Sequence, residues 1–197
     1  MQRITLRGGL ELDNPFQVAL DFIEAYPGYD SHDSDPTSFD ESDLRLANRG
    51  GARISAAEIA AVLERRGRIE RALRAIDADA SLAARSVPWS SLNELFEAFA
   101  DIRGVGFSKM TKALHPKRPA LIPLLDSVVQ AYLEPEASLP EPFGERATAL
   151  VRSYKQDLDR NRPALREVRR ELGRRGYPLT EVRILDLLIW SVRAAAD

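Results

Sequence analysis

Apolar residues recur at helical spacing along nearly the whole chain, and this periodicity limits the fold more than any other feature of the sequence. The start signal Asn14–Pro15 and the break Pro27–Gly28 bound one such helix. Thr180 stands where it caps a last helix with a wide apolar face. The only segment with strand character is Ile4–Leu12. The pattern therefore predicts an all-α protein.

Capping boxes mark where two of the helices begin. In such a box a Ser side chain and a Glu three residues later satisfy each other's free backbone N–H groups. Ser55 with Glu58 predicts one helix start, and Ser91 with Glu94 predicts another for a helix ending at about Asp101. Further helices are expected at Glu41–Ala47, in a segment ending at Ile76, at Ser127–Leu133, and in two charged segments of which the second is bounded by Asn161 and Gly176.

The composition excludes several classes of protein. With 197 residues, the chain suffices for one domain or for two small lobes on a shared core. It has no Cys, which excludes a disulfide framework, a thiolate zinc site and a Cys-bound iron–sulfur cluster. His32 and His115 are too few for a metal centre, and His115 is interpreted as a phosphate contact or a helix C-terminal residue. Because no apolar run reaches about 18 residues, we expect a cytoplasmic protein without membrane contact. A monomer without a cofactor is expected as well.

The charges are unevenly distributed although the net charge is only −2. Residues Gly8–Leu44 include ten acids and no Lys or Arg, whereas Ile102–Leu125 include five bases and no acid. Such segregation can direct a cationic face at phosphates. A second excess of bases, Arg152–Arg175, is interpreted as a solvated helix face.

The segment Ile102–Tyr132 has the most informative pattern. A tight Gly104–Gly106 turn leads into a helix at Phe107–Leu114, and we expect only residues without a Cβ to fit both flanking positions. The first amides of that helix, together with its dipole, suit a phosphate group. The candidate phosphate-binding residues are Gly104, Gly106, Phe107, Ser108, Lys109 and Lys112.

This segment resembles the helix-hairpin-helix superfamily of DNA glycosylases. Gly104–Gly106 matches the hairpin, Pro123–Asp126 matches the Gly/Pro-Asp element, and the 20-residue spacing from Gly106 to Asp126 agrees with the family. The resemblance covers about thirty residues. It implies one domain over residues 1–197 with a two-lobed all-α fold, the hairpin at about 91–115 and the Asp element at about 119–133. The chain also resembles a bacterial branch known only as a domain of unknown function.

Departures from the family pattern point to a subgroup. Leu-Pro before the hairpin is Ile102–Arg103 here, and the Lys with which some members cleave the DNA backbone is replaced by Ser108. Members with this replacement only remove the base, so the resemblance implies a monofunctional enzyme. Lys109 is rotated by about 100° around the helix, and strand cleavage by Lys109 remains a minor alternative.

The resemblance makes Asp126 the catalytic residue. A fixed carboxylate stabilises the positive charge that develops on deoxyribose as the glycosidic bond breaks, and it orients or deprotonates the attacking water. The alternative role is a helix N-cap, for which Asp is well suited. The two roles are compatible.

Other site residues are candidates by analogy. A wedge that fills the space left by a flipped base is placed at Asn48 and Arg49, although a plain glycine-rich turn is favoured there. A monovalent cation is expected at the hairpin carbonyls of Ile102 and Val105. Base-pocket walls, with core packing as the alternative, are Tyr26, Tyr29, Trp89 and Trp190.

The sequence thus predicts a glycosylase that acts on a modified base in double-stranded DNA. Its setting is base-excision repair, or defence against phage DNA carrying modified bases. Two alternatives from other classes stay open: a non-catalytic helix-hairpin-helix DNA-binding module and a protein-interaction domain.

Overall fold

The computed structural model describes residues 3–25, 29–30, 34–133 and 142–194, most of which are helical. The α-helices are α1 (Pro15–Ala25), α2 (Glu41–Arg49), α3 (Ala56–Glu64), α4 (Arg66–Arg74), α5 (Trp89–Glu97), α6 (Phe107–Leu114), α7 (Ser127–Leu133), α8 (Phe143–Arg160), α9 (Arg162–Arg174) and α10 (Glu181–Ala194). The remaining described elements are the 3-10 helices η1 (Arg7–Gly9) and η2 (His115–Lys117) and the strands β1 (Ile4–Thr5) and β2 (Glu11–Leu12). The predicted all-α class is confirmed.

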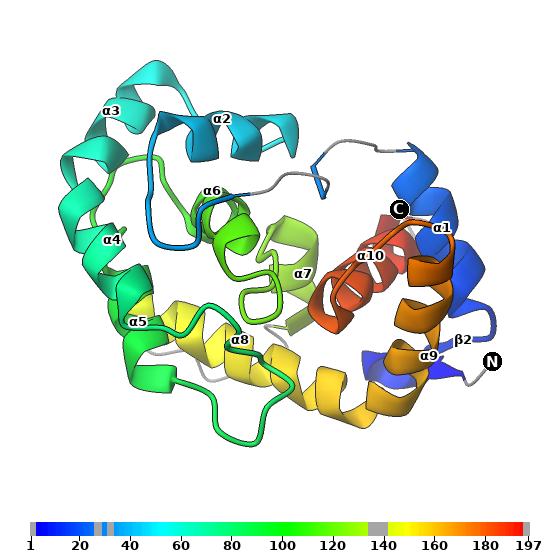
Figure 1. Cartoon of the computed structure of the whole chain (residues 1–197). Coiled ribbons are helices and arrows are strands. Elements are labelled where there is room, and N and C mark those ends of the chain that lie inside the picture. The colour runs from blue at the N-terminus through cyan, green and yellow to red at the C-terminus, as the bar shows by residue number, and fades with distance from the viewer. Residues whose placement is uncertain (1–2, 26–28, 31–33, 134–141, 195–197) are drawn as a thin grey trace.

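Helices α6 and α7 lie in the middle of the helical array. Figure 1 shows α2, α3 and α4 on one side of them and α1, α9 and α10 on the other, with α8 running below. In the described part of the chain, every α-helix contributes buried side chains to one hydrophobic cluster. Helices α6 and α7 are therefore surrounded by the rest of the fold, whereas Gly104 and Gly106 in the turn before α6 are exposed.

Two predicted helix starts are confirmed by their hydrogen bonds. The backbone N–H of Glu58 donates to Ser55 Oγ at 3.3 Å, and Ser55 N–H donates to the Glu58 carboxylate at 2.8 Å, which completes the capping box of α3. At α10, Thr180 Oγ1 accepts a hydrogen bond from the N–H of Arg183 at 3.1 Å. Each cap satisfies a backbone donor that the helix itself leaves unpaired.

The capping box predicted at Ser91 and Glu94 is wrong. With Ser91 as the N-cap the helix would begin at Leu92, but α5 begins three residues earlier, at Trp89, and no side chain caps it. The carbonyl of Pro88 accepts the first helical hydrogen bond, from Leu92 N–H. Because proline fixes its own φ and needs no N–H partner, it starts the helix before the Ser-x-x-Glu pattern is reached.

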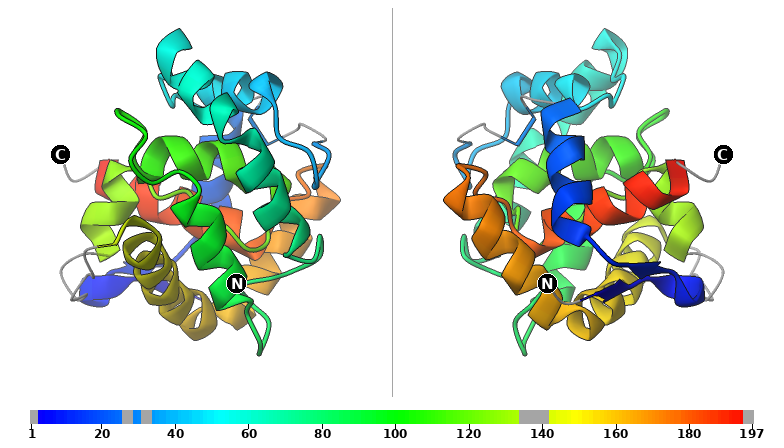
Figure 2. Two further views of the ribbon diagram at one scale, coloured as in Figure 1. Left: turned by 90° about the vertical axis from the view of Figure 1, so that its left-hand side faces the viewer. Right: turned by 90° about the vertical axis from the view of Figure 1, so that its right-hand side faces the viewer.

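The β-hairpin formed by β1 and β2 packs against α8. Strands β1 and β2 pair antiparallel, and the loop between them places Arg7 against α8, where its Nε donates to Asp157 Oδ2 at 2.6 Å. Both side chains of this ion pair are buried. Asn161 adds hydrogen bonds to the backbone N–H and carbonyl of Thr5. The right-hand view of Figure 2 shows the hairpin against this helix.

Candidate functional site

The hairpin turn needs glycine at one of its two predicted positions. Gly104 has φ +82°, and a Cβ there would collide with the carboxylate of Glu58. Gly106 is extended, with φ −94° and ψ −172°, and nothing lies within 4 Å of an added Cβ. The expectation of a strict glycine requirement is therefore confirmed for Gly104 and wrong for Gly106, where the backbone conformation is open to any residue.

The N-terminus of α6 carries no side-chain cap, but one of its lysines is already paired. Gly106 is the N-cap residue, and it provides no side-chain acceptor for the first amides of α6. Lys109 Nζ donates to both carboxylate oxygens of Glu58, at 2.7 and 2.8 Å. This hydrogen bond is the main reason why the pKa of Glu58 is lowered. A phosphate that uses Lys109 would therefore have to displace a carboxylate supplied by α3.

Asp126 stands at the N-terminus of α7. Its Oδ1 accepts a hydrogen bond from the N–H of Val129 at 3.0 Å, so the capping role foreseen as the alternative is confirmed. The side chain stays partly exposed. One carboxylate oxygen of Asp126 thus caps α7, while the side chain stays partly accessible to solvent.

The loop before α7 is tied to both neighbouring helices. The N–H of Leu125 donates to Thr111 Oγ1 on α6 at 3.0 Å. The N–H of Leu124 donates to Asp186 Oδ2 on α10 at 3.1 Å. Because these bonds hold consecutive residues directly before Asp126, its carboxylate has a defined position between α6 and α10.

A cavity of about 360 Å³ opens beside this carboxylate. Five residues singled out from the sequence line this cavity: Tyr29, Arg49, Lys112, Asp126 and Trp190. They come from the three helices α2, α6 and α10, from the residue directly before α7, and from the loop that contains Tyr29. Gly50 and Gly51, from the turn between α2 and α3, complete one wall. The fold therefore gathers the predicted catalytic residue, one predicted wedge residue and two predicted pocket aromatics at one place.

Lys112 and Tyr29 are held together at the cavity wall. The Tyr29 hydroxyl donates to the Lys112 carbonyl at 2.7 Å. Burial raises the pKa of Tyr29 well above its usual range, so the phenol stays neutral. Burial lowers the pKa of Lys112, an effect that the nearby Asp126 carboxylate opposes. A Cβ at Gly50 would lie 2.7 Å from the Tyr29 ring, so glycine is what allows this close approach.

Three other sequence candidates lie outside this cluster. Trp89 lines a separate groove, where the Arg152 guanidinium lies 4.5 Å from its ring centre. The Asn48 side-chain amide accepts a hydrogen bond from the N–H of Ile54 at 2.6 Å and donates one to the Ile54 carbonyl at 2.9 Å, which fits the plain-turn interpretation. Arg49 is exposed and stays the wedge candidate. Tyr26 lies outside the described residues.

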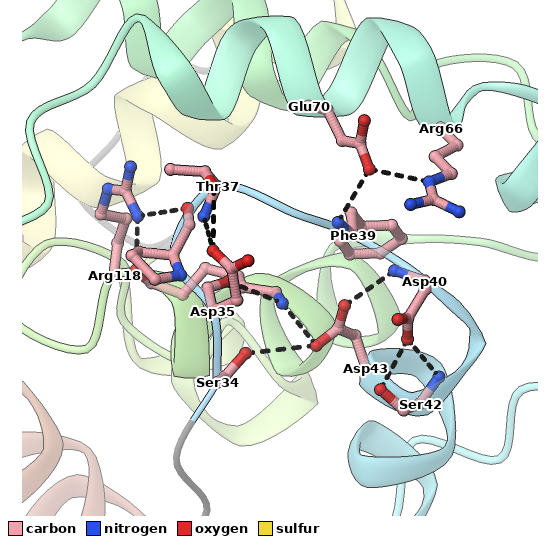
Figure 3. Close-up of polar contacts among 12 residues, drawn as sticks. Ser34, Asp35, Thr37, Phe39, Asp40, Ser42, Asp43, Arg66, Glu70 and Arg118 are labelled. Carbon is pink, nitrogen blue, oxygen red and sulfur yellow. Dashed lines mark hydrogen bonds and ion pairs between the residues drawn. The ribbon is translucent and has the colours of Figure 1, made fainter.

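The basic segment contributes less to a cationic face than its charges suggest. Lys117 Nζ pairs with Asp43 at 2.7 Å, and both side chains are buried. The Arg118 guanidinium is 1 % exposed and donates to four backbone carbonyls. Figure 3 shows how the acidic segment 34–43 packs across this region. Asp43 thus neutralises Lys117 and the segment 34–43 covers Arg118, so these two of the five bases are not available to a cationic face.

His115 is a structural residue. It follows the last residue of α6, and its ring is 4 % exposed, with Nδ1–H donating to the Ile122 carbonyl at 2.6 Å. Burial lowers its pKa to about 4, so the ring is neutral at physiological pH. The helix C-terminal interpretation is confirmed, and the buried ring offers no surface contact to phosphate.

Two charged residues of the cavity escaped the sequence reasoning. Arg183 and Asp186 both lie on α10 and line the cavity. The Arg183 guanidinium forms a two-armed ion pair with Asp30, at 2.7 and 3.0 Å. The signal for Asp186 was present in the sequence, because it is the lone acid in the apolar run Ile184–Ile189. A buried charge in such a run demands a partner or a function.

Among the described residues, no group of three or more His, Asp or Glu side chains is placed to hold a metal ion. The carbonyl of Ile102 accepts the N–H of Val105 at 3.0 Å within the hairpin turn. The monovalent cation at these carbonyls stays a prediction.

Comparison with known proteins identifies a family but no characterised relative. The profile of a family of unknown function, DUF6308, matches residues 19–193. No curated protein and no solved structure matches the chain. In the part of the chain that the structure describes, no helix combines the length and apolar character needed to cross a membrane.

Proposed function

The chain belongs to the DUF6308 family, and from the cavity beside Asp126 we propose that it is a monofunctional DNA glycosylase of the helix-hairpin-helix superfamily. One observation carries the proposal: Asp126 shares a cavity of about 360 Å³ with the aromatic rings of Tyr29 and Trp190. This volume lies within the range of about 300–1,000 Å³ that is usual for small-molecule sites. A single flipped base is a ligand of that class.

Asp126 supplies the chemistry in this proposal. Its carboxylate faces the developing positive charge on the deoxyribose and activates water for attack at C1′. The apolar side chains of Leu124, Val129 and Leu187 line the same cavity. They lower the local polarity, which strengthens the interaction between the carboxylate and the charged transition state.

The duplex approaches over the hairpin and the turn between α2 and α3. The uncapped N-terminus of α6 accepts a phosphate, and Lys109 joins this contact once Glu58 releases it. Arg49 is exposed at the cavity edge and occupies the space that the flipped base leaves. The two-lobed fold that the resemblance implies is part of this proposal.

The base is a damaged base of the host genome or a modified base of phage DNA. Release of free base from a duplex panel containing both kinds, compared between wild type and Asp126→Asn, tests the activity directly. Asp159→Asn is the matched control, because this acid is exposed and its ion pair among the described residues is with Lys155 on the same helix. We expect abasic sites with wild type and Asp159→Asn, and none with Asp126→Asn.

The same experiment separates the alternatives. If no duplex loses a base while wild type and Asp126→Asn bind DNA equally well, the chain is a non-catalytic DNA-binding module. If the chain shows no salt-dependent affinity for DNA, the hairpin serves protein interaction instead. Either result refutes the glycosylase proposal.

A further inference from the structure

A second carboxyl group lies in the cavity that contains Asp126. Asp186 on α10 is 2 % exposed and belongs to the cavity lining. Its Oδ2 accepts the N–H of Leu124, whereas no donor in the described part of the chain forms a hydrogen bond with its Oδ1. The nearby Tyr154 hydroxyl donates to the Val182 carbonyl instead, at 2.6 Å. A buried oxygen without a partner is costly, and a ligand in the cavity would satisfy it.

The surroundings of Asp186 keep its proton in place near neutral pH. Burial raises its pKa to about 8, and the charge on Asp126 acts in the same direction. Arg183 opposes this shift, as do the hydrogen bond from Leu124 and the nearby Tyr154 hydroxyl. The Arg183 guanidinium is shared with Asp30, which limits its effect. At pH 7 the Asp186 carboxyl is therefore mostly a neutral acid.

Ionisable groups reach this cavity from α2, α6, α10 and the residue before α7, whereas α1 and α7 line it with the apolar Phe22 and Val129. Arg183 shares α10 with Asp186, Lys112 comes from α6, and Arg49 comes from α2. Asp126 is the remaining acid of the lining. The two carboxyl groups differ in environment, since Asp126 is partly exposed and Asp186 is buried. Two carboxyl groups in contrasting environments are the usual basis for dividing acid and base roles in one site.

We propose that Asp186 is the general acid that protonates the departing base, while Asp126 acts on the sugar and the water. This inference rests on the proposed glycosylase function. As the bond between C1′ and the base nitrogen breaks, its electron pair leaves with the base, and the Asp186 proton moves to a ring nitrogen or carbonyl oxygen of that base. The water oxygen bonds to C1′, and its proton passes to Asp126. Proton exchange with solvent restores both carboxyl groups.

The assignment defines the class of substrate. A neutral base is a poor leaving group and gains from a proton, whereas a base alkylated on a ring nitrogen is already cationic and departs neutral without one. The free Oδ1 of Asp186 suits a base that presents a hydrogen-bond acceptor away from the sugar. The site is thus built for neutral modified bases with such an acceptor.

Single-turnover base release tests the inference. The substrates are duplexes with one hypoxanthine, a neutral base, or one 7-methylguanine, a cationic base. The variant is Asp186→Asn, whose amide oxygen can still accept the hydrogen bond from Leu124. We expect about 100-fold slower release of hypoxanthine, within the usual contribution of a general acid, and little change for 7-methylguanine. Wild-type release of hypoxanthine should also decline above about pH 8, where Asp186 loses its proton.

The outcomes separate this inference from the function on which it rests. Equal losses on both bases, or wild-type release of 7-methylguanine alone, would overturn the role of Asp186 and leave the glycosylase in place. If wild type releases hypoxanthine but not 7-methylguanine, the test is the pH dependence of hypoxanthine release. A release rate that does not fall with rising pH also overturns the role of Asp186. Absence of base release from any duplex removes both proposals. The pH dependence of wild-type release needs no variant, so the inference stays testable even if Asp186→Asn does not fold.

Discussion

Replacing Asp186 with Asn should change how the stability of the protein depends on pH. Burial raises the pKa of this carboxyl from an ordinary 3.8 to about 8. Between these values the folded chain holds a proton that the unfolded chain has released, so folding takes up one proton. The free energy of unfolding therefore falls as pH rises, by at most about 1.4 kcal/mol per pH unit. The contribution is fully present below pH 4 and is lost as pH passes through 8.

The size of the effect can be measured against the neutral variant. From pH 5 to pH 8, the stability of wild type relative to Asp186→Asn should drop by about 3–4 kcal/mol, because Asn carries no titrating group. Urea denaturation at four pH values in this range gives the difference. Asp159→Asn is the control, since that acid is exposed on α8. A difference between wild type and Asp186→Asn that stays constant over the range would refute the reasoning.

Three further predictions concern the framework of the site. Arg118→Met should lower the free energy of unfolding by about 3–5 kcal/mol in urea denaturation, because four carbonyls lose a buried charged donor; a loss below about 1 kcal/mol would contradict this. Gly104→Ala should lower the melting temperature by several degrees through its positive φ and the collision with Glu58, whereas Gly106→Ala should leave it unchanged; equal effects would count against the described turn. Glu58→Gln frees Lys109 and should strengthen duplex binding, with a salt dependence steeper by about one phosphate contact; weaker binding in salt titrations would exclude a phosphate role for Lys109.

Local signals in the sequence were enough to place the framework of the candidate site. The bounds of α6 and α7 agree with the predicted segments, because glycine, proline and Asp caps act on their immediate neighbours. The capping box at Ser55 and Glu58 held for the same reason. The failure at Ser91 shows the limit of such signals, since Pro88 offered a competing start only a few residues away.

Contacts between distant segments could not be read from the sequence. Nothing in the pattern indicates that Asp43 neutralises Lys117, or that Glu58 has a second role in binding Lys109. These pairs depend on how whole helices pack, and that is decided by many apolar contacts together. Asp186 could be predicted only in part. Its apolar sequence neighbours indicate a buried acid, but they do not indicate the cavity that it lines.

The position of Trp190 allows ligand binding in the cavity to be measured by tryptophan fluorescence. The chain has two tryptophans, and Trp89 lies in a separate groove beside Arg152. The ring of Trp190 lines the cavity and meets Phe22 edge-on, with ring centres 5.1 Å apart. In a Trp89→Phe variant, Trp190 is the one tryptophan left in the chain, and its emission, excited selectively over that of the five tyrosines, responds to a ligand that enters the cavity. Occupancy of the cavity, and the rates at which a base enters and leaves, can then be followed in real time without any label on the DNA.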